Sequence, residues 1–111
     1  MARWMIVMHR ETSGGTGLME RSEPMIHWLG GLRSRGQLID GDPIAPGGHV
    51  LERANDVVID RPINGTGTTA GITGYFIIDA MSESEAVAIA RSCPVLTEGT
   101  TVILRRVWRV G

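Results

Sequence analysis

Three segments of this sequence have the composition of β-strands whose two faces are both apolar. In the first, Trp4 and Ile6 alternate with Met5 and Val7, so that bulky apolar side chains fall on each side. Successive side chains of a strand point to opposite faces of its sheet, and strands of this kind therefore need cover on both faces. This need constrains the fold more than any other feature of the sequence. The segments are residues 3–9, 74–79 and 102–108, the last being apolar on both faces at its start.

A first helix signal follows the first strand. Ser22 can cap a helix that runs to about Arg35, and Gly36 supplies the left-handed residue that ends it. Glycine inside a helix costs stability relative to alanine, so the pair Gly30-Gly31 predicts close packing of this helix against the sheet.

A second helix signal lies closer to the C-terminus. Ser82 and Glu85 form a capping box that starts this helix, and Pro94 ends it. Between the two helices, residues 41–43 (Gly-Asp-Pro) predict a bend, and Asn55-Asp56 has the chemistry of a hairpin turn. The expected elements between the helices are a short strand around residues 38–39, that bend, and hairpin strands at 49–53 and 56–60.

Two helices can cover only one face of a four-stranded sheet. The apolar side chains of the other face then need a second cover. Burying one large apolar side chain stabilises a protein by about 1.5–3 kcal/mol, and a side chain left in water does not contribute this free energy. A second copy of the same sheet is the simplest cover, since a two-fold interface presents the same patch to itself. We therefore predict one α+β domain over residues 1–111, a ferredoxin-like β-α-β-β-α-β sandwich with an inserted hairpin that forms a dimeric α+β barrel. A pocket is expected between the sheet, the first helix and the polar loops.

Composition limits the partners and the compartment. The formal net charge is −1 at pH 7 and the basic residues, all arginine, are spread along the chain, so we expect no nucleic-acid partner. No apolar run approaches the ~20 residues of a membrane span, and no secretory signal opens the sequence. Cys93, the lone cysteine, is expected to be buried, and a single thiol suits the cytoplasm. The spacing of histidines and cysteine argues against a metal site, and we expect no cofactor.

Several stretches of the second half resemble one known family. Residues 74–79 (Gly-Tyr-Phe-Ile-Ile-Asp), 82–86 (Ser-Glu-Ser-Glu-Ala) and 90–94 (Ala-Arg-Ser-Cys-Pro) are similar to a strand and a helix of the YCII-related domains. The similarity is to the branch that is named for its Asp-Gly-Pro-Phe signature, which stands here as Asp60-Arg61-Pro62-Ile63. The resemblance implies the same dimeric α+β barrel.

The resemblance also points to His27. This residue matches a histidine of the YCII branch that is proposed to work with an aspartate at the end of the first strand, where His9 or Arg10 stands in this sequence. Independently, an imidazole on a helix beside the expected pocket suits a general acid or base near neutral pH. The structural alternative is a histidine at the edge of the helix packing.

The candidate catalytic residues are His27 as acid or base, with Asp42 and His9 orienting it or the substrate. Asp42 can equally well hydrogen-bond its own turn, and His9 can equally well be an exposed strand end. His49 follows two glycines and is expected in a turn. The candidate ligand-binding residues are Arg10, Asp60, Tyr75 and Trp28, although aromatic residues at such spacings also serve as core.

Two functions fit these residues. The first is a cofactor-free enzyme that acts on a small metabolite by proton transfer, as a lyase, isomerase or dehalogenase; the resembled family includes what looks like a dehydrochlorinase of a chlorinated hydroquinone. The second is a non-catalytic binding or regulatory module, since other family members are similar to partners of alternative sigma factors. An arginine where the family has an acid favours the second.

Overall fold

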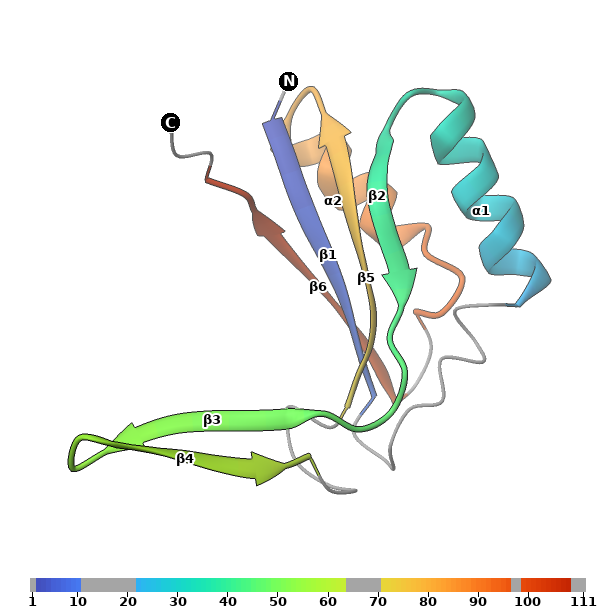
Figure 1. The fold of residues 1–111 in the computed structure, drawn as a ribbon. Coiled ribbons are helices and arrows are strands. Elements are labelled where there is room, and N and C mark those ends of the chain that lie inside the picture. Colours follow the sequence, from blue (N-terminus) through green and yellow to red (C-terminus); the bar gives the residue numbers. More distant parts are fainter. Residues whose placement is uncertain (1, 11–21, 64–70, 97–98, 109–111) are drawn as a thin grey trace.

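The structure, a computed structural model, describes residues 2–10, 22–63, 71–96 and 99–108. Its elements are β1 (Ala2–Arg10), α1 (Glu23–Ser34), β2 (Leu38–Pro43), β3 (His49–Ala54), β4 (Val57–Pro62), β5 (Ile72–Ala80), α2 (Glu83–Arg91) and β6 (Thr100–Arg106). Within these ranges, four strands form an antiparallel sheet in the order β2-β5-β1-β6, and β3 pairs with β4 in a separate hairpin (Figure 1). With the hairpin set aside, this is the ferredoxin-like arrangement, and the predicted α+β fold is confirmed. The dimeric barrel involves a second copy and stays a prediction.

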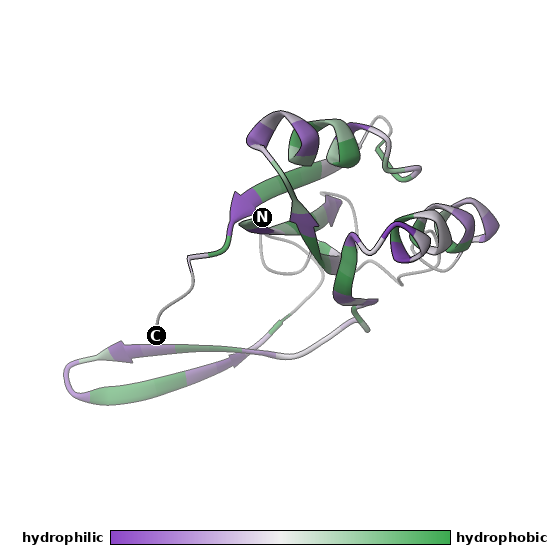
Figure 2. Cartoon of the chain, turned by 90° about the horizontal axis from the view of Figure 1, so that it is seen from above, coloured by the Kyte–Doolittle hydropathy of each residue, from purple (hydrophilic) through white to green (hydrophobic). Residues whose placement is uncertain are grey.

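Both helices pack on one face of the sheet (Figures 1 and 2). Burial alternates along β1 because every second side chain points toward the helices. Apolar residues of β1 and β5 on that side meet apolar residues of α1 and α2, which is how the sheet and the helices share one core. Its members include Trp4, Ile6, Met8, Phe76 and Ile78 from the sheet and Met25, Leu32, Ala86 and Ile89 from the helices.

Helix α1 has the predicted bounds and the predicted stop. Gly36 follows it with a φ of 70°, a left-handed conformation that glycine adopts without steric cost. The expectation of close packing at Gly30-Gly31 is wrong. A Cβ at Gly30 would meet nothing within 4 Å, and one at Gly31 would meet the side chain of Arg35. The pair lies off the buried stripe, so the sheet is not its neighbour. Neither helix of the described ranges is long and apolar enough to cross a membrane.

Strand β2 continues where a bend was predicted. It runs through Pro43, which is tolerated because β2 is an edge strand that needs no ladder hydrogen bond on its outer side. Gly41 has a φ of 146°, and a Cβ there would overlap the backbone carbonyl of Tyr75 and the ring of Phe76. In this segment, Gly41 therefore allows β2 and β5 to pair closely, and Pro43 occupies a strand edge that needs no hydrogen bond on its outer side.

Helix α2 starts at the predicted capping box. The Ser82 hydroxyl accepts the backbone N–H of Glu85 at 3.1 Å. The Glu85 carboxylate in turn accepts the side-chain amide of Gln37 at 3.1 Å, which ties the start of α2 to the segment before β2. Cys93 follows the helix and is buried, as expected.

The hairpin extends away from the rest of the described chain (Figure 1). Its two-residue turn, Asn55-Asp56, has φ values of 50° and 64°, which is the left-handed pair that a tight hairpin turn of this kind requires. The predicted hairpin is confirmed. His49, expected in a turn, is instead the first residue of β3.

We expect Gly41→Ala to lower the free energy of unfolding by about 3 kcal/mol, because the new methyl group meets backbone atoms that cannot move aside and the positive φ disfavours alanine. The matched control is Gly30→Ala, where space is open and alanine favours the helix, so stability should rise by about 0.5–1 kcal/mol. Urea unfolding followed by circular dichroism measures both. Equal effects of the two substitutions would contradict the tight β2–β5 contact.

Candidate functional site

The face of the sheet opposite the helices is here called the open face. Because paired residues of antiparallel strands share a face, the strand register assigns its members. Its centre is apolar, and Ile103 keeps 40% of its surface exposed. No described helix or strand lies over it (Figures 1 and 2). The open face consists of Arg3, Met5, Val7 and His9 of β1, Tyr75, Ile77 and Asp79 of β5, Asp40 and Asp42 of β2, and Thr101, Ile103 and Arg105 of β6.

Three polar side chains gather at one end of this face, called here the polar rim: His9, Tyr75 and Asp42. Asp42 pairs with Tyr75, and Tyr75 pairs on its other side with Val7, two residues before His9. Neighbouring strands lie about 4.8 Å apart and successive residues about 3.3 Å, so Asp42 and His9, two strands and two residues apart, arise about 12 Å from each other with Tyr75 between them. An imidazole, a phenol and a carboxylate are thus collected beside an apolar surface.

Gly71 positions His9 within the rim. The backbone N–H of Arg10 donates to the Gly71 carbonyl at 2.7 Å, which holds the chain before β5 against the end of β1. A Cβ at Gly71 would lie 2.7 Å from Nε2 of His9. The imidazole therefore lies directly over a buried glycine, and the register shift between Met8 and His9 accompanies this close approach.

Two of the predicted site residues, Trp28 and His27, lie on α1, on the opposite side of the sheet from the polar rim. Trp28 on α1 donates from Nε1 to the Ser92 hydroxyl at 2.9 Å, and its ring meets the ring of Phe76 edge-on, with centroids 6.1 Å apart. These contacts join α1 to the end of α2 and to the core. His27 is its exposed neighbour on α1. The sheet lies between His27 and the pair His9 and Asp42, so one chain does not assemble the three predicted catalytic residues in one place.

Arg10 and Asp60 also lie outside the polar rim. Arg10 is on the helix side of the sheet, where Nε donates to the Thr100 hydroxyl at 3.2 Å. Asp60 belongs to the hairpin, and its Oδ1 lies 2.8 Å from Nδ1 of His49. This pair of an imidazole and a carboxylate was not predicted. The register set by the Asn55-Asp56 turn makes the two side chains diagonal neighbours on one face of the hairpin, and that signal is present in the sequence.

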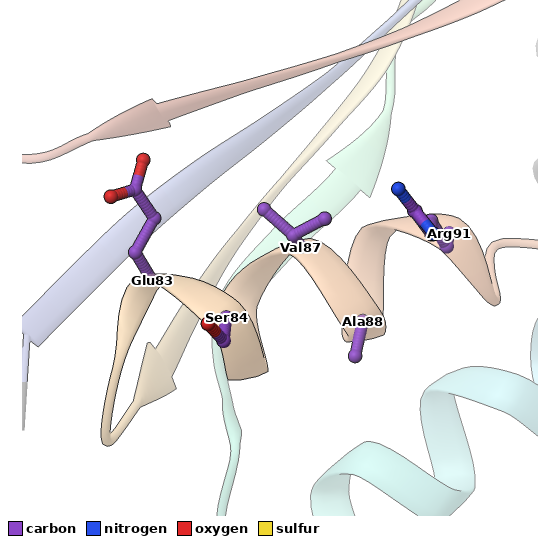
Figure 3. A pocket seen from close by; sticks show the side chains of 5 residues that line it. All are labelled: Glu83, Ser84, Val87, Ala88 and Arg91. Carbon is purple, nitrogen blue, oxygen red and sulfur yellow. The ribbon is translucent and has the colours of Figure 1, made fainter.

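A hollow of about 460 Å³ lies beside α2, and the described residues that line it all belong to this helix (Figure 3). Because no second element of the described ranges contributes a side chain, these residues do not form a cleft between elements. Among the described residues, no three histidine, cysteine, aspartate or glutamate side chains are grouped to hold a metal ion. The lining residues are Glu83, Ser84, Val87, Ala88 and Arg91.

Comparison with known proteins adds little to this geometry. The sequence matches no protein-family model, and no curated protein matches it. A similar solved structure is 5-chloro-2-hydroxyhydroquinone dehydrochlorinase from Burkholderia phenoliruptrix AC1100, in complex with 2,5-dihydroxybenzoquinone. The two chains are 17% identical with a TM-score of 0.48, over 96% of this chain and 95% of that chain. Nothing is carried from that enzyme at this level of likeness, and the resemblance to YCII-related domains stays a prediction.

We expect Gly71→Ala to displace the imidazole of His9, because the added methyl group takes up space that the ring now occupies. In an NMR spectrum with assigned histidine rings, the His9 ring signals should move, whereas those of His27 on α1 should stay in place. Unchanged His9 signals in a folded Gly71→Ala variant would contradict the contact.

Proposed function

We propose that this protein is a homodimer that acts on a small molecule by acid–base chemistry at the polar rim. The observation that carries the proposal is the open face itself. One surface combines a broad apolar centre with an imidazole, a phenol and a carboxylate at its end. The apolar centre favours a second copy, and the polar rim favours a substrate with hydrogen-bonding groups.

The dimer follows from the free energy of the apolar centre. Met5, Val7 and Ile77 keep part of their surface in solvent in a single chain, as do Tyr75 and Ile103. Covering the remaining surface of five such side chains contributes about 1 kcal/mol each, which is in the range that offsets the cost of associating two molecules. A two-fold axis lets the open face of one copy cover that of the other.

The rim residues suit proton transfer in a sheltered site. The imidazole of His9 is a group that can serve as a general acid or a general base. Tyr75 can donate a hydrogen bond to an oxygen on which negative charge develops, and Asp42 can accept one from a hydroxyl group of the substrate. A second sheet over the open face would exclude water, which strengthens each of these interactions. Such a group fits a lyase, isomerase or dehalogenase that needs no further cofactor.

The second candidate is a non-catalytic binding module. One observation favours it: His27 lies across the sheet from His9 and Asp42, so the three residues predicted to share the proton transfer are separated within the chain. In this case the rim recognises a ligand without converting it, and the protein regulates a partner.

Substitutions at the rim test the site. With small hydroxylated aromatic compounds as probes, we expect Tyr75→Phe and Asp42→Ala each to weaken binding about tenfold, because each removes one hydrogen bond to the ligand. His9→Gln should abolish turnover of any compound that is converted but leave binding within a few fold. The matched control is His27→Gln, which should change neither. Loss of turnover in His27→Gln with full activity in His9→Gln would contradict the rim and favour the helix-borne site. Binding without conversion favours the module.

Sedimentation tests the dimer. We expect the wild type to sediment at about 24 kDa, twice the 12.0 kDa of the chain. Ile77→Glu places a charge at the centre of the open face and should yield a folded monomer. Ile26→Glu, on the exposed side of α1, is the control that should remain dimeric. A wild type that is monomeric at tens of micromolar would contradict the proposal.

A further inference from the structure

The hairpin, called here the β3–β4 arm (residues 49–62), exposes apolar side chains on both of its faces. Leu51 and Val58 lie on one face, and Val57 and Ile59 lie on the other. Their exposed fractions run from 42% to 64%, and every residue of β4 is exposed. A two-stranded ribbon in water is marginally stable at best, so an arm of this composition needs a surface to lie on.

The charges of the arm narrow the chemistry of that surface. Arg61 forms an ion pair with Glu52, and His49 contacts Asp60 at 2.8 Å. These cross-strand pairs compensate one another within the arm and leave no basic stripe that would fit nucleic acid or an anionic membrane. The apolar side chains between them fit another apolar protein surface.

The direction of the arm shows where such a surface would lie. In both views the arm runs away from α1 and α2, and it leaves the body on the side of the sheet that carries no helix (Figures 1 and 2). This is the side of the open face. A molecule docked on the open face would therefore lie within reach of the arm.

Hydrogen bonds hold the arm in its hairpin form and tie the chain before it to the sheet. Its turn is a tight pair of left-handed residues, Asn55-Asp56, and at its base the Ile63 N–H donates to the Gly48 carbonyl at 2.9 Å. Just before the arm, the Ile44 N–H donates to the Thr73 carbonyl of β5 at 2.9 Å, which anchors the chain to the sheet.

The open face by itself is smaller than the interface of a typical stable complex, and the arm would enlarge it. Four strands about 4.8 Å apart and about five residues long span a flat area of roughly 330 Å², and the ~800 Å² of accessible surface that each partner of a stable complex typically contributes needs a larger patch. A six-residue ribbon covers about 200 Å² more, and the surface that receives the partner's ribbon adds as much again. With both arms engaged, the footprint approaches the typical size.

We propose that the β3–β4 arm lies across a second copy of this chain and completes the dimer that the open faces begin. The inference rests on the proposed dimer and goes beyond it, because it assigns a second contact that is separate from the sheet face. By two-fold symmetry each copy gives one arm and receives one. The occupant of the arm's apolar surface is thus the partner copy.

Cross-linking between isotopically distinct copies tests this contact. A benzophenone amino acid is placed at position 58 of the arm, and equal amounts of ¹⁵N-labelled and unlabelled protein are mixed, equilibrated and irradiated. Mass spectrometry should find cross-linked peptides that join a labelled chain to an unlabelled one. The same group at position 26 on α1 is the control and should give none. Cross-links within one chain alone, or none from position 58 on one face of the arm and none from position 59 on the other face in a second variant, would overturn the proposal.

Sedimentation separates failure of the arm from failure of the dimer. The variants Leu51→Ser/Val58→Ser and Val57→Ser/Ile59→Ser each remove the apolar groups of one face of the arm. At least one should raise the dimer Kd about tenfold or more, with the circular dichroism of the body unchanged. If both keep the wild-type Kd, the arm proposal is wrong and the open-face dimer stands. A monomeric wild type would overturn both.

Discussion

The difference between the two faces of one four-stranded sheet underlies the rest of this structure. On the face that the helices cover, Ile6, Met8 and Phe76 are buried, and the removal of such groups from water is the main favourable term in folding. Met5 and Val7 alternate with them along β1 and retain contact with solvent. A strand cannot turn all its side chains to one side, so a strand that is apolar at nearly every position needs two covers, and the two helices supply one.

The same constraint joins the candidate site to assembly. His9, Tyr75 and Asp42 lie on the face that lacks a cover, at the end of its apolar centre. A molecule that covers this centre also shields the rim from water, and the strength of hydrogen bonds and charges in the rim rises as water leaves. The β3–β4 arm extends on the same side, with the pairs Arg61–Glu52 and His49–Asp60 formed across its strands and its apolar groups exposed. In the proposed dimer, one partner therefore both shelters the rim and buries the apolar surface.

Local signals predicted the elements well where one interaction decides them. Ser82 and Glu85 satisfy backbone groups within one turn of chain, and Asn55-Asp56 turns the hairpin with its own two residues. Prediction failed where a distant segment decides. Gly41 and Pro43 indicated a bend because both residues are common in turns, but Gly41 is used for close contact with Phe76 and Pro43 for an exposed strand edge. Gly30 and Gly31 indicated a tight contact with the sheet, yet they lie off the stripe of α1 that faces it.

By itself, the sequence determined the order of helices and strands, the ferredoxin-like class of the fold and the presence of apolar groups on both sides of the sheet, because these depend on side-chain period and on caps and turns within a few residues. Only the tertiary structure decided which candidate residues share a surface. Asp42 joins Tyr75 through the pairing of β2 with β5, while His27 and Trp28 lie across the sheet on α1. The pairing of strands that are far apart in the chain, and the side on which a helix packs, are set by contacts between those distant segments, which a local pattern does not encode.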